Sequence, residues 1–211
     1  NAGMLFEEGK ISGLLIVSPK GNLNNWDSNE ISRHLPERIK RNVLVWQPNH
    51  TQRWTKAFKD MVQNDSTGVL NIFLVNVEAF ATVKACTHVE EFLVTHDAMM
   101  AIDESTTIKN PKAKRTKHLI KLGPLADYRR ILTGFPITKA PLDLYSQCYF
   151  LSPNLLGFSS FYAFQARYAI TQSRQMGRHA FQQVMGFQKL DELQESIKDF
   201  SIRRRKEECL D

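Results

Sequence analysis

Two adjacent carboxylates, Asp103 and Glu104, are the side chains of this sequence best placed to do chemistry. They follow directly on the apolar run Met99–Ile102, which indicates a buried parallel strand, and ligands of open α/β sheets bind at the carboxyl ends of such strands. A carboxylate there can hold Mg²⁺, directly or through water, because this ion prefers oxygen ligands. A neighbouring carboxylate can orient an attacking water. The alternative is that either acid only caps the turn that follows.

Four further short apolar runs predict the strands that surround this one, over residues 14–17, 43–46, 72–75 and 131–134. Each ends in polar residues or in helix and strand breakers, such as Ser18-Pro19-Lys20. Segments with apolar residues at helical spacing separate the runs; one of them carries Trp54, Phe58 and Met61. This alternation predicts an α/β fold with a doubly wound, mostly parallel sheet.

The strand pattern stops after residue 141, which divides the chain into two parts. We expect residues 1–141 to form the sheet domain and residues 142–211 to form an entirely helical extension. Aromatic residues gather between Phe158 and Tyr168 and predict the core between the extension and the sheet. A last helix is expected on Leu190, Leu193, Ile197 and Phe200.

The composition is that of a globular protein with an excess of basic residues and a formal net charge of +6. This charge favours a polyanionic partner, although many basic proteins bind nothing acidic. No apolar run reaches the ~18 residues of a membrane-spanning helix, so we expect no membrane contact. Cys86, Cys148 and Cys209 lie far apart, without metal-ligand spacing, and fit a reducing compartment. We therefore expect an intracellular protein, in the cytoplasm of a bacterial host or in a eukaryotic nucleus.

In this order, the strand ends resemble the motifs of the first RecA-like motor lobe of SWI/SNF-like ATPases, double-stranded DNA translocases of helicase superfamily two. The likeness is specific as an ordered set and weak for any single piece. It resembles most the compact phage or viral members. The segments that carry it are Ile16–Trp26 (motif Ia), Val75–Phe80, Ile102–Asn110 (motif II), Leu132–Ile137 continuing to Tyr145 (motif III), and Phe200–Glu208 at the end of the lobe.

The resemblance implies an ATP hydrolase that uses Mg²⁺ and acts on double-stranded DNA, with ATP bound between this lobe and a second RecA-like lobe of the parent chain. It implies that Asp103 holds Mg²⁺ and that Glu104 positions the attacking water. Trp26 is expected only to pack against the sheet. The remaining implied site residues are Thr133, Gly134 and Pro136 for coupling hydrolysis to movement, and Lys20, Lys109 and Asn110 for DNA binding.

Two departures from the family pattern stand out. Phe135 replaces the second threonine of the T-G-T-P form of motif III, so a hydroxyl that helps coupling is missing. The phosphate-cradling Walker A loop is missing too, because Gly3 and Gly9 are too far apart and Ile11, not a Ser or Thr, follows Lys10. Family order places that loop just before Asn1. We therefore expect a fragment that is inactive alone.

Two rival functions stay open at this point. A nucleic-acid-binding or scaffold domain could keep the motor fold after loss of its ATPase activity, and the missing loop would then be a real loss. A metal-dependent nuclease could use Asp103 and Glu104, but it needs further acidic ligands and a lysine that the sequence does not supply.

Overall fold

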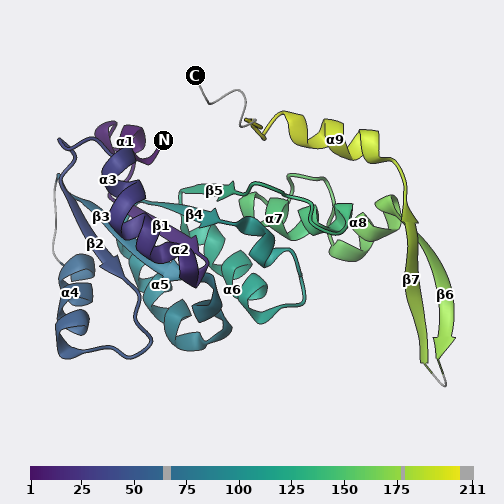
Figure 1. The fold of residues 1–211 in the computed structure, drawn as a ribbon, viewed down its shortest axis with the longest axis horizontal. Coiled ribbons are helices and arrows are strands. Elements are labelled where there is room, and N and C mark those ends of the chain that lie inside the picture. The colour runs from purple at the N-terminus through teal and green to yellow at the C-terminus, as the bar shows by residue number, and fades with distance from the viewer. Residues whose placement is uncertain (64–67, 177–178, 205–211) are drawn as a thin grey trace.

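The computed structural model describes residues 1–63, 68–176 and 179–204, and its centre is a five-stranded sheet (Figure 1). The strand order is β2-β3-β1-β4-β5, and every neighbouring pair is parallel. This confirms the predicted α/β class. The strands are β1 (Gly13–Ser18), β2 (Arg41–Val45), β3 (Leu70–Asn76), β4 (Ala98–Asp103) and β5 (Tyr128–Leu132).

Helices cover both faces of the sheet, as the alternating pattern predicted. One face packs against α1 (Ala2–Glu7), α2 (Lys20–Asn25) and α3 (Ile31–His34), with a π-helix at Trp26–Glu30 between the last two. The other face packs against α4 (Gln52–Gln63), α5 (Val83–Thr95) and α6 (Lys114–Leu122). Short 3-10 helices follow β3 at Val77–Ala81, β4 at Ser105–Ile108 and α6 at Gly123–Leu125.

The middle strand β1 is buried along its whole length, because helices lie on both of its faces and strands on both of its sides. Leu15 and Val17 point into one core cluster, and Leu14 and Ile16 into the other. This two-sided burial explains why the run is continuously apolar. Its register with β4 pairs Val17 with Ile102, so that the next residues of the two strands, Ser18 and Asp103, lie side by side.

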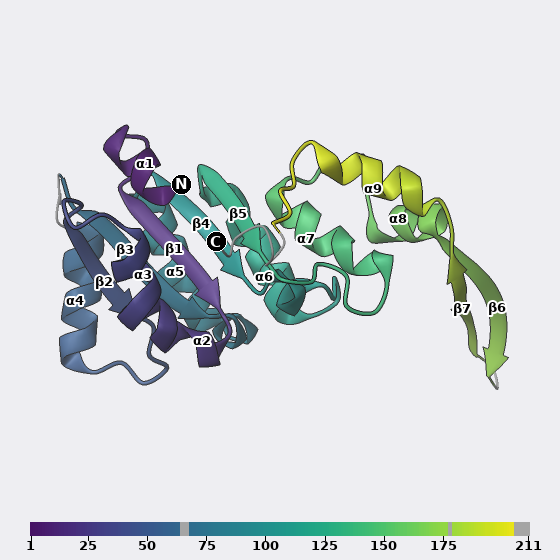
Figure 2. The same ribbon diagram turned by 45° about the horizontal axis from the view of Figure 1, so that its top comes forward.

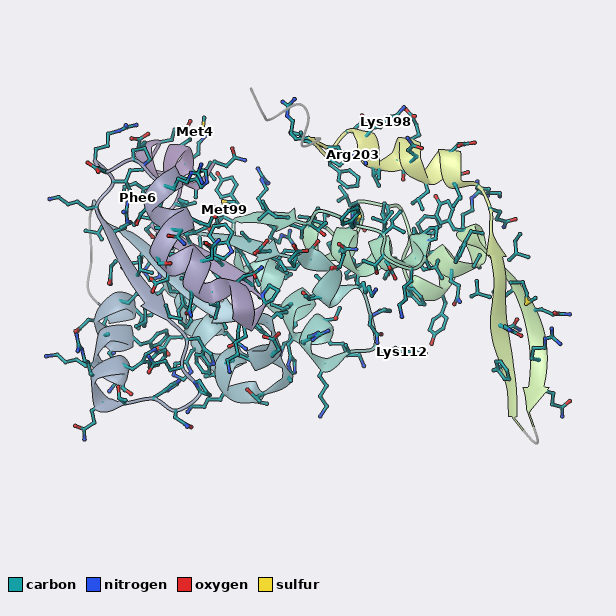
Figure 3. All side chains as sticks on the ribbon, viewed as in Figure 1. Met4, Phe6, Met99, Lys112, Lys198 and Arg203 are labelled. Carbon is teal, nitrogen blue, oxygen red and sulfur yellow. The ribbon has the colours of Figure 1, made fainter. Side chains whose placement is uncertain are left out.

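In its described residues the extension holds the α-helices α7 (Leu144–Leu151), α8 (Phe161–Tyr168) and α9 (Leu190–Lys198), and a 3-10 helix at Pro141–Asp143 introduces it. Their apolar side chains form a separate core cluster around Tyr145, Phe164 and Leu193. In both ribbon views α9 returns over α7 and α8 (Figure 2). Lys198 is the last residue of α9, and Arg203 lies in the segment that follows it (Figure 3).

The prediction that residues 142–211 are entirely helical is wrong between α8 and α9. An antiparallel hairpin, β6 (Ala169–Met176) and β7 (His179–Phe187), stands there and projects away from the sheet (Figure 1). Only β6 is mostly polar, and in neither strand do apolar and polar residues alternate along the whole length, so the hairpin lacks the pattern that identifies a strand from sequence. The family-like segment Arg205–Glu208 lies outside the described residues.

The strand β5 is an edge of the sheet, next to the first residues of the chain. Leu132, at its end, is 46% exposed. A cavity of about 370 Å³ lies beside it, and its lining includes Ala2, Gly3, Trp26 and Ile131. In the part of the chain that the structure describes, no helix is long and apolar enough to cross a membrane.

Candidate active site

Asp103 lies at the carboxyl end of β4, and three donors hold its carboxylate. The Ser18 hydroxyl and the Trp26 indole Nε1–H both donate to Oδ2 at 2.9 Å. The backbone N–H of Glu104 donates to Oδ1 at 3.0 Å. Ser18 comes there because β1 and β4 are adjacent and parallel, so that their ends meet at one edge of the sheet. The carboxylate is thus held in one orientation while remaining partly exposed.

Trp26 does more than the packing role that the sequence predicted. Its ring packs against the core on the α1–α3 side of the sheet, while its N–H reaches Asp103. Trp26 is the first residue of the π-helix Trp26–Glu30, and short π-helical turns are frequent at functional sites. No sequence signal separates this tryptophan from an ordinary core residue.

Glu104 has left-handed backbone angles, φ 49° and ψ 56°. A residue other than glycine in this region costs of order 1 kcal/mol, and such residues gather at functional sites. The unusual backbone turns the chain out of β4 and into the 3-10 helix Ser105–Ile108. The Glu104 side chain is partly exposed, so its carboxylate can contact water next to Asp103.

This arrangement fits Mg²⁺ bound in the way that nucleotide hydrolases hold it. Magnesium keeps most of its water and takes one or two carboxylates together with substrate phosphates. Asp103 supplies one oriented carboxylate at an open edge. Among the described residues no cluster of three or more His, Cys, Asp or Glu side chains could enclose a metal ion.

A buried glutamine on α7, Gln147, joins motif II to motif III. Its Oε1 accepts a hydrogen bond from the Ser105 hydroxyl at 2.6 Å, and its Nε2 donates to the carbonyls of Pro136 and Asp143 at 2.8 and 2.7 Å. Both Ser105 and Gln147 are fully buried. The sequence analysis missed this residue, although a glutamine in the apolar helix Leu144–Leu151 was a signal that it has buried partners.

The motif III residues form an exposed loop after β5. Thr133, Gly134 and Pro136 follow Leu132, and the Thr133 hydroxyl accepts from the backbone N–H of Phe135 at 3.2 Å. Phe135 is 78% exposed and Ile137 44% exposed. The loop therefore presents an apolar surface, not a hydroxyl, at the position where the family motif has its second threonine.

Asp143 fixes the far end of this loop and holds Lys109 of motif II. Its Oδ2 accepts from the backbone N–H groups of Thr138 and Lys139, both at 3.0 Å, and lies 3.5 Å from the Lys109 ammonium. Burial alone would raise the pKa of Asp143, but these hydrogen bonds and the lysine charge lower it below its ordinary value. The two motifs are thus joined a second time.

The residues predicted to bind DNA do not form one cluster with the acids. Lys20 is exposed at the start of α2, just beyond the end of β1. Asn110 is exposed too, and its Oδ1 caps the next turn by accepting from the Lys112 N–H at 2.9 Å. Lys109 is engaged by Asp143 and Thr138. A DNA role for these three side chains stays a prediction.

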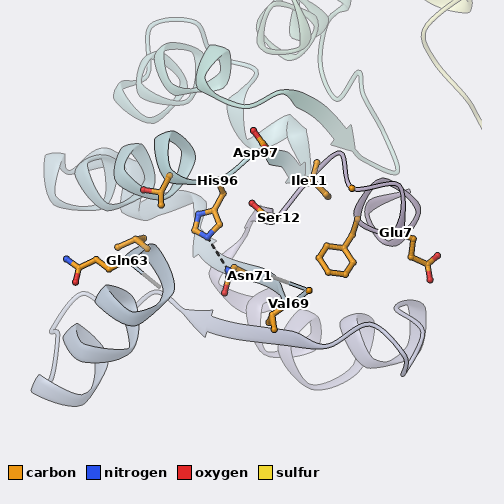
Figure 4. A pocket seen from close by; sticks show the side chains of 13 residues that line it. Glu7, Ile11, Ser12, Gln63, Val69, Asn71, His96 and Asp97 are labelled. Atoms are coloured by element: carbon orange, nitrogen blue, oxygen red, sulfur yellow. Dashed lines mark hydrogen bonds between the residues drawn. The ribbon is translucent and has the colours of Figure 1, made fainter. Parts of the chain in front are cut away.

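A second cavity, of about 800 Å³, lies at the opposite end of the strands, where they begin (Figure 4). Its lining includes Asn71, His96 and Asp97, and the Asn71 amide lies 3.1 Å from the His96 Nε2. Burial lowers the pKa of His96. Asp103 is at the other end of β4, so this cavity is not part of the site described above.

The five-stranded parallel sheet with helices on both faces is the α/β fold of a RecA-like lobe, and a carboxylate is fixed at the carboxyl end of its strand β4. Residues 3–210 match the model of the family described as SNF2-related domain. The chain therefore belongs to this family, within the SWI2/SNF2 ATPases of helicase superfamily two.

Curated relatives support this membership. The chain is 28% identical over 197 residues to a bovine protein named DNA annealing helicase and endonuclease ZRANB3, a match that covers 93% of the chain and 17% of the relative. It is 38% identical over 111 residues to human TATA-binding protein-associated factor 172, covering 52% of the chain and 6% of the relative. The chain thus spans only a small part of the curated relatives that it matches.

Solved structures agree on the fold. The SWI2/SNF2 ATPase core domain of Sulfolobus solfataricus is 26% identical, with a TM-score of 0.53, over 78% of this chain and 29% of that one. The same core solved in complex with dsDNA is 24% identical, with a TM-score of 0.56, over 78% of this chain and 30% of that one. At 24% identity, this second likeness is evidence for a shared fold only.

Proposed function

We propose that this chain is the first motor lobe of an ATP-dependent translocase of double-stranded DNA, related to helicases. The observation that carries the proposal is the Asp103 carboxylate, held by Ser18 and Trp26 at the carboxyl end of β4. An acid that only capped a turn would not need donors from two other elements. Family membership and the basic net charge of +6 support the same reading.

In the proposed function Asp103 holds the Mg²⁺ of bound ATP, directly or through water, and Glu104 positions the attacking water. Bound Mg²⁺ supplies positive charge to the phosphate oxygens. Ser18 and Trp26 keep Asp103 in its orientation, so that it need not rearrange during the reaction. Gln147 links the turn after Glu104 to the Pro136 loop by hydrogen bonds, so that a displacement of motif II also displaces motif III.

A complete site needs parts that these residues do not supply. We infer that a Walker A loop elsewhere in the parent chain binds the phosphates, and that the open edge of β5 supports the strand that carries it. The exposed Leu132, Phe135 and Ile137 fit contact with a second RecA-like lobe, because apolar side chains gathered in one loop favour burial. Lys20 and Asn110 are proposed to contact DNA phosphates.

Origin and location belong to the proposal as well. The likeness to phage or viral members stays a prediction, and so does an intracellular location, in bacterial cytoplasm or a eukaryotic nucleus.

The test is ATP hydrolysis measured with and without duplex DNA. We expect the whole protein to hydrolyse ATP faster when duplex DNA is present, and to lose this stimulation as salt is raised, because phosphate contacts release counterions. The isolated chain should hydrolyse ATP no faster than its Glu104→Gln variant. If the whole protein binds duplex DNA without any turnover, the scaffold alternative is correct and the motor proposal is wrong.

A further inference from the structure

The β6–β7 hairpin has no role in the proposed function of the motor lobe. It projects from the α8–α9 end of the molecule, away from the sheet and the acids, in both ribbon views (Figures 1 and 2). A two-stranded ribbon that stands alone is marginally stable in water. Its exposed apolar side chains, Ile170, Phe181 and Met185, are 50%, 46% and 54% exposed.

The charge of this region has one sign. No Asp or Glu occurs between Asp143 and Asp191, whereas Arg167, Arg174, Arg178 and Lys189 fall in that interval. Arg167 forms an ion pair with Glu192 at the base of the hairpin. Within the described residues, no carboxylate pairs with Arg174. A surface of this kind attracts a polyanion and repels an acidic protein.

The register of the hairpin places Phe181 beside Arg174. The two residues are directly opposite each other, and directly opposite residues share a face of the ribbon. Gln172 and Gln183 form the next pair on the same face. An exposed aromatic ring next to an arginine and two amides is the set of groups that stacks on bases and hydrogen-bonds to their edges. In residues 171–174 and 181–184, the opposite face carries Thr171, Ser173, Gln182 and Val184, and therefore neither an aromatic ring nor a charge.

We propose that this face, defined by Gln172, Arg174, Phe181 and Gln183, binds unpaired bases of a DNA strand next to the duplex on which the motor acts. The proposal rests on the proposed function, because it takes DNA as the substrate. Inside a duplex each base face is covered by its neighbours, so a phenylalanine ring must force a base step apart to insert there. On an unpaired strand the base faces are open, and the ring stacks on them without that cost. The Arg174 guanidinium then reaches the phosphate or the same base.

Fluorescence anisotropy on this chain, with labelled DNA, tests the proposal. The probes are a blunt duplex and the same duplex with a single-stranded oligothymidylate tail. We expect tighter binding of the tailed duplex and a loss of about tenfold in that affinity for Phe181→Ala, since the ring no longer stacks on a base of the tail. Affinity for the blunt duplex should stay unchanged. Phe181→Tyr, which keeps a ring, should bind the tail as the original chain does.

The matched control is Gln182→Ala, an exposed residue next in sequence whose pairing with Ser173 puts it on the opposite face. It should bind both probes as the original chain does. The proposal would be overturned if Phe181→Ala bound each of the two probes as tightly as the original chain does. It would also be overturned if Phe181→Ala lost the same factor of affinity for the blunt duplex as for the tailed one. Because no ATP turnover is measured, a whole protein without ATPase activity would refute the motor and leave this result intact.

Discussion

At the scale of single residues, the orientation of Asp103 depends on donors that come from two other elements. Ser18 ends β1, and Trp26 begins the π-helix that follows α2. A carboxylate that accepts charge-assisted hydrogen bonds from both is fixed without any metal. The indole N–H therefore has a measurable role that is separate from the packing of its ring.

We predict an energetic coupling between Trp26 and Asp103 in urea unfolding. Trp26→Phe keeps an aromatic ring but removes the donor, and we expect it to lower the free energy of unfolding by about 1.5–3 kcal/mol, because the bond is to a charged group. In an Asp103→Asn background the loss should be smaller by about 1 kcal/mol. Trp54→Phe is the control, since its N–H donates to the neutral carbonyl of Val45. Additive effects of Trp26→Phe and Asp103→Asn would contradict the account.

Gln147 gives a second prediction at this scale. Gln147→Leu has similar volume but leaves the buried Ser105 hydroxyl and the Pro136 carbonyl without their partner. We expect a loss of about 1–3 kcal/mol in unfolding free energy, with faster amide hydrogen exchange in residues 133–140. Ser146→Ala is the control, because the neighbouring Ser146 hydroxyl is buried and has no hydrogen-bond partner among the described residues. Its removal should be neutral or stabilising, and a Gln147→Leu chain of unchanged stability would count against the bridge.

The site residues could be predicted from sequence only where a pattern marks them. Asp103 and Glu104 were found because two acids end an apolar run. Trp26 and Gln147 were not found as site residues, because their partners are distant in sequence: 77 residues for the Trp26–Asp103 pair and 42 for the Ser105–Gln147 pair. Such pairs follow from the sheet order and from the docking of α7, which composition and periodicity do not specify.

At the scale of elements, the two ends of β1 have different constraints. Its carboxyl end carries Ser18, whose hydroxyl donates a hydrogen bond to Asp103. Its beginning is Gly13, where the strand lies directly against α5. A Cβ atom added at Gly13 would lie 2.7 Å from the Cβ of His96 and 3.1 Å from the Phe92 ring. The absence of a side chain there allows the close approach of strand and helix.

We therefore predict that Gly13→Ala lowers the free energy of unfolding by about 1–3 kcal/mol, as overpacking does in well-packed cores. Gly21→Ala is the control, because nothing lies within 4 Å of a Cβ added there and Gly21 is inside α2. That change should be neutral or stabilising by a few tenths of a kcal/mol or more. Equal melting temperatures for the two variants would show that the strand and α5 are not held this closely.

The strands and helices of residues 1–141 could be predicted because two-sided burial makes each strand a continuous apolar run. The fifth strand was placed too late: it is Tyr128–Leu132, and Thr133 and Gly134 follow it in the loop. As an edge strand it has few buried side chains, so its charged residues Arg129 and Arg130 hid its beginning. The hairpin was missed for the related reason that its faces are exposed.

At the scale of the whole molecule, the parts are arranged along one line, with the sheet at one end, the hairpin at the other and α7 to α9 between them (Figure 1). The acids lie at the sheet edge that faces the motif III loop, and the exposed Phe135 lies in that loop. A second lobe docked there would cover both. The hairpin would stay free to contact DNA outside the closed site.

The rate of ATP hydrolysis by the whole protein on duplex DNA, measured for Glu104→Gln, tests this account most directly. We predict that turnover falls by at least about a hundredfold, as for loss of a general base, while ATP binding is retained. Glu90→Gln, an exposed change on α5 far from the site, should hydrolyse ATP at the original rate. Unchanged turnover in Glu104→Gln would contradict the assignment of the paired acids to catalysis.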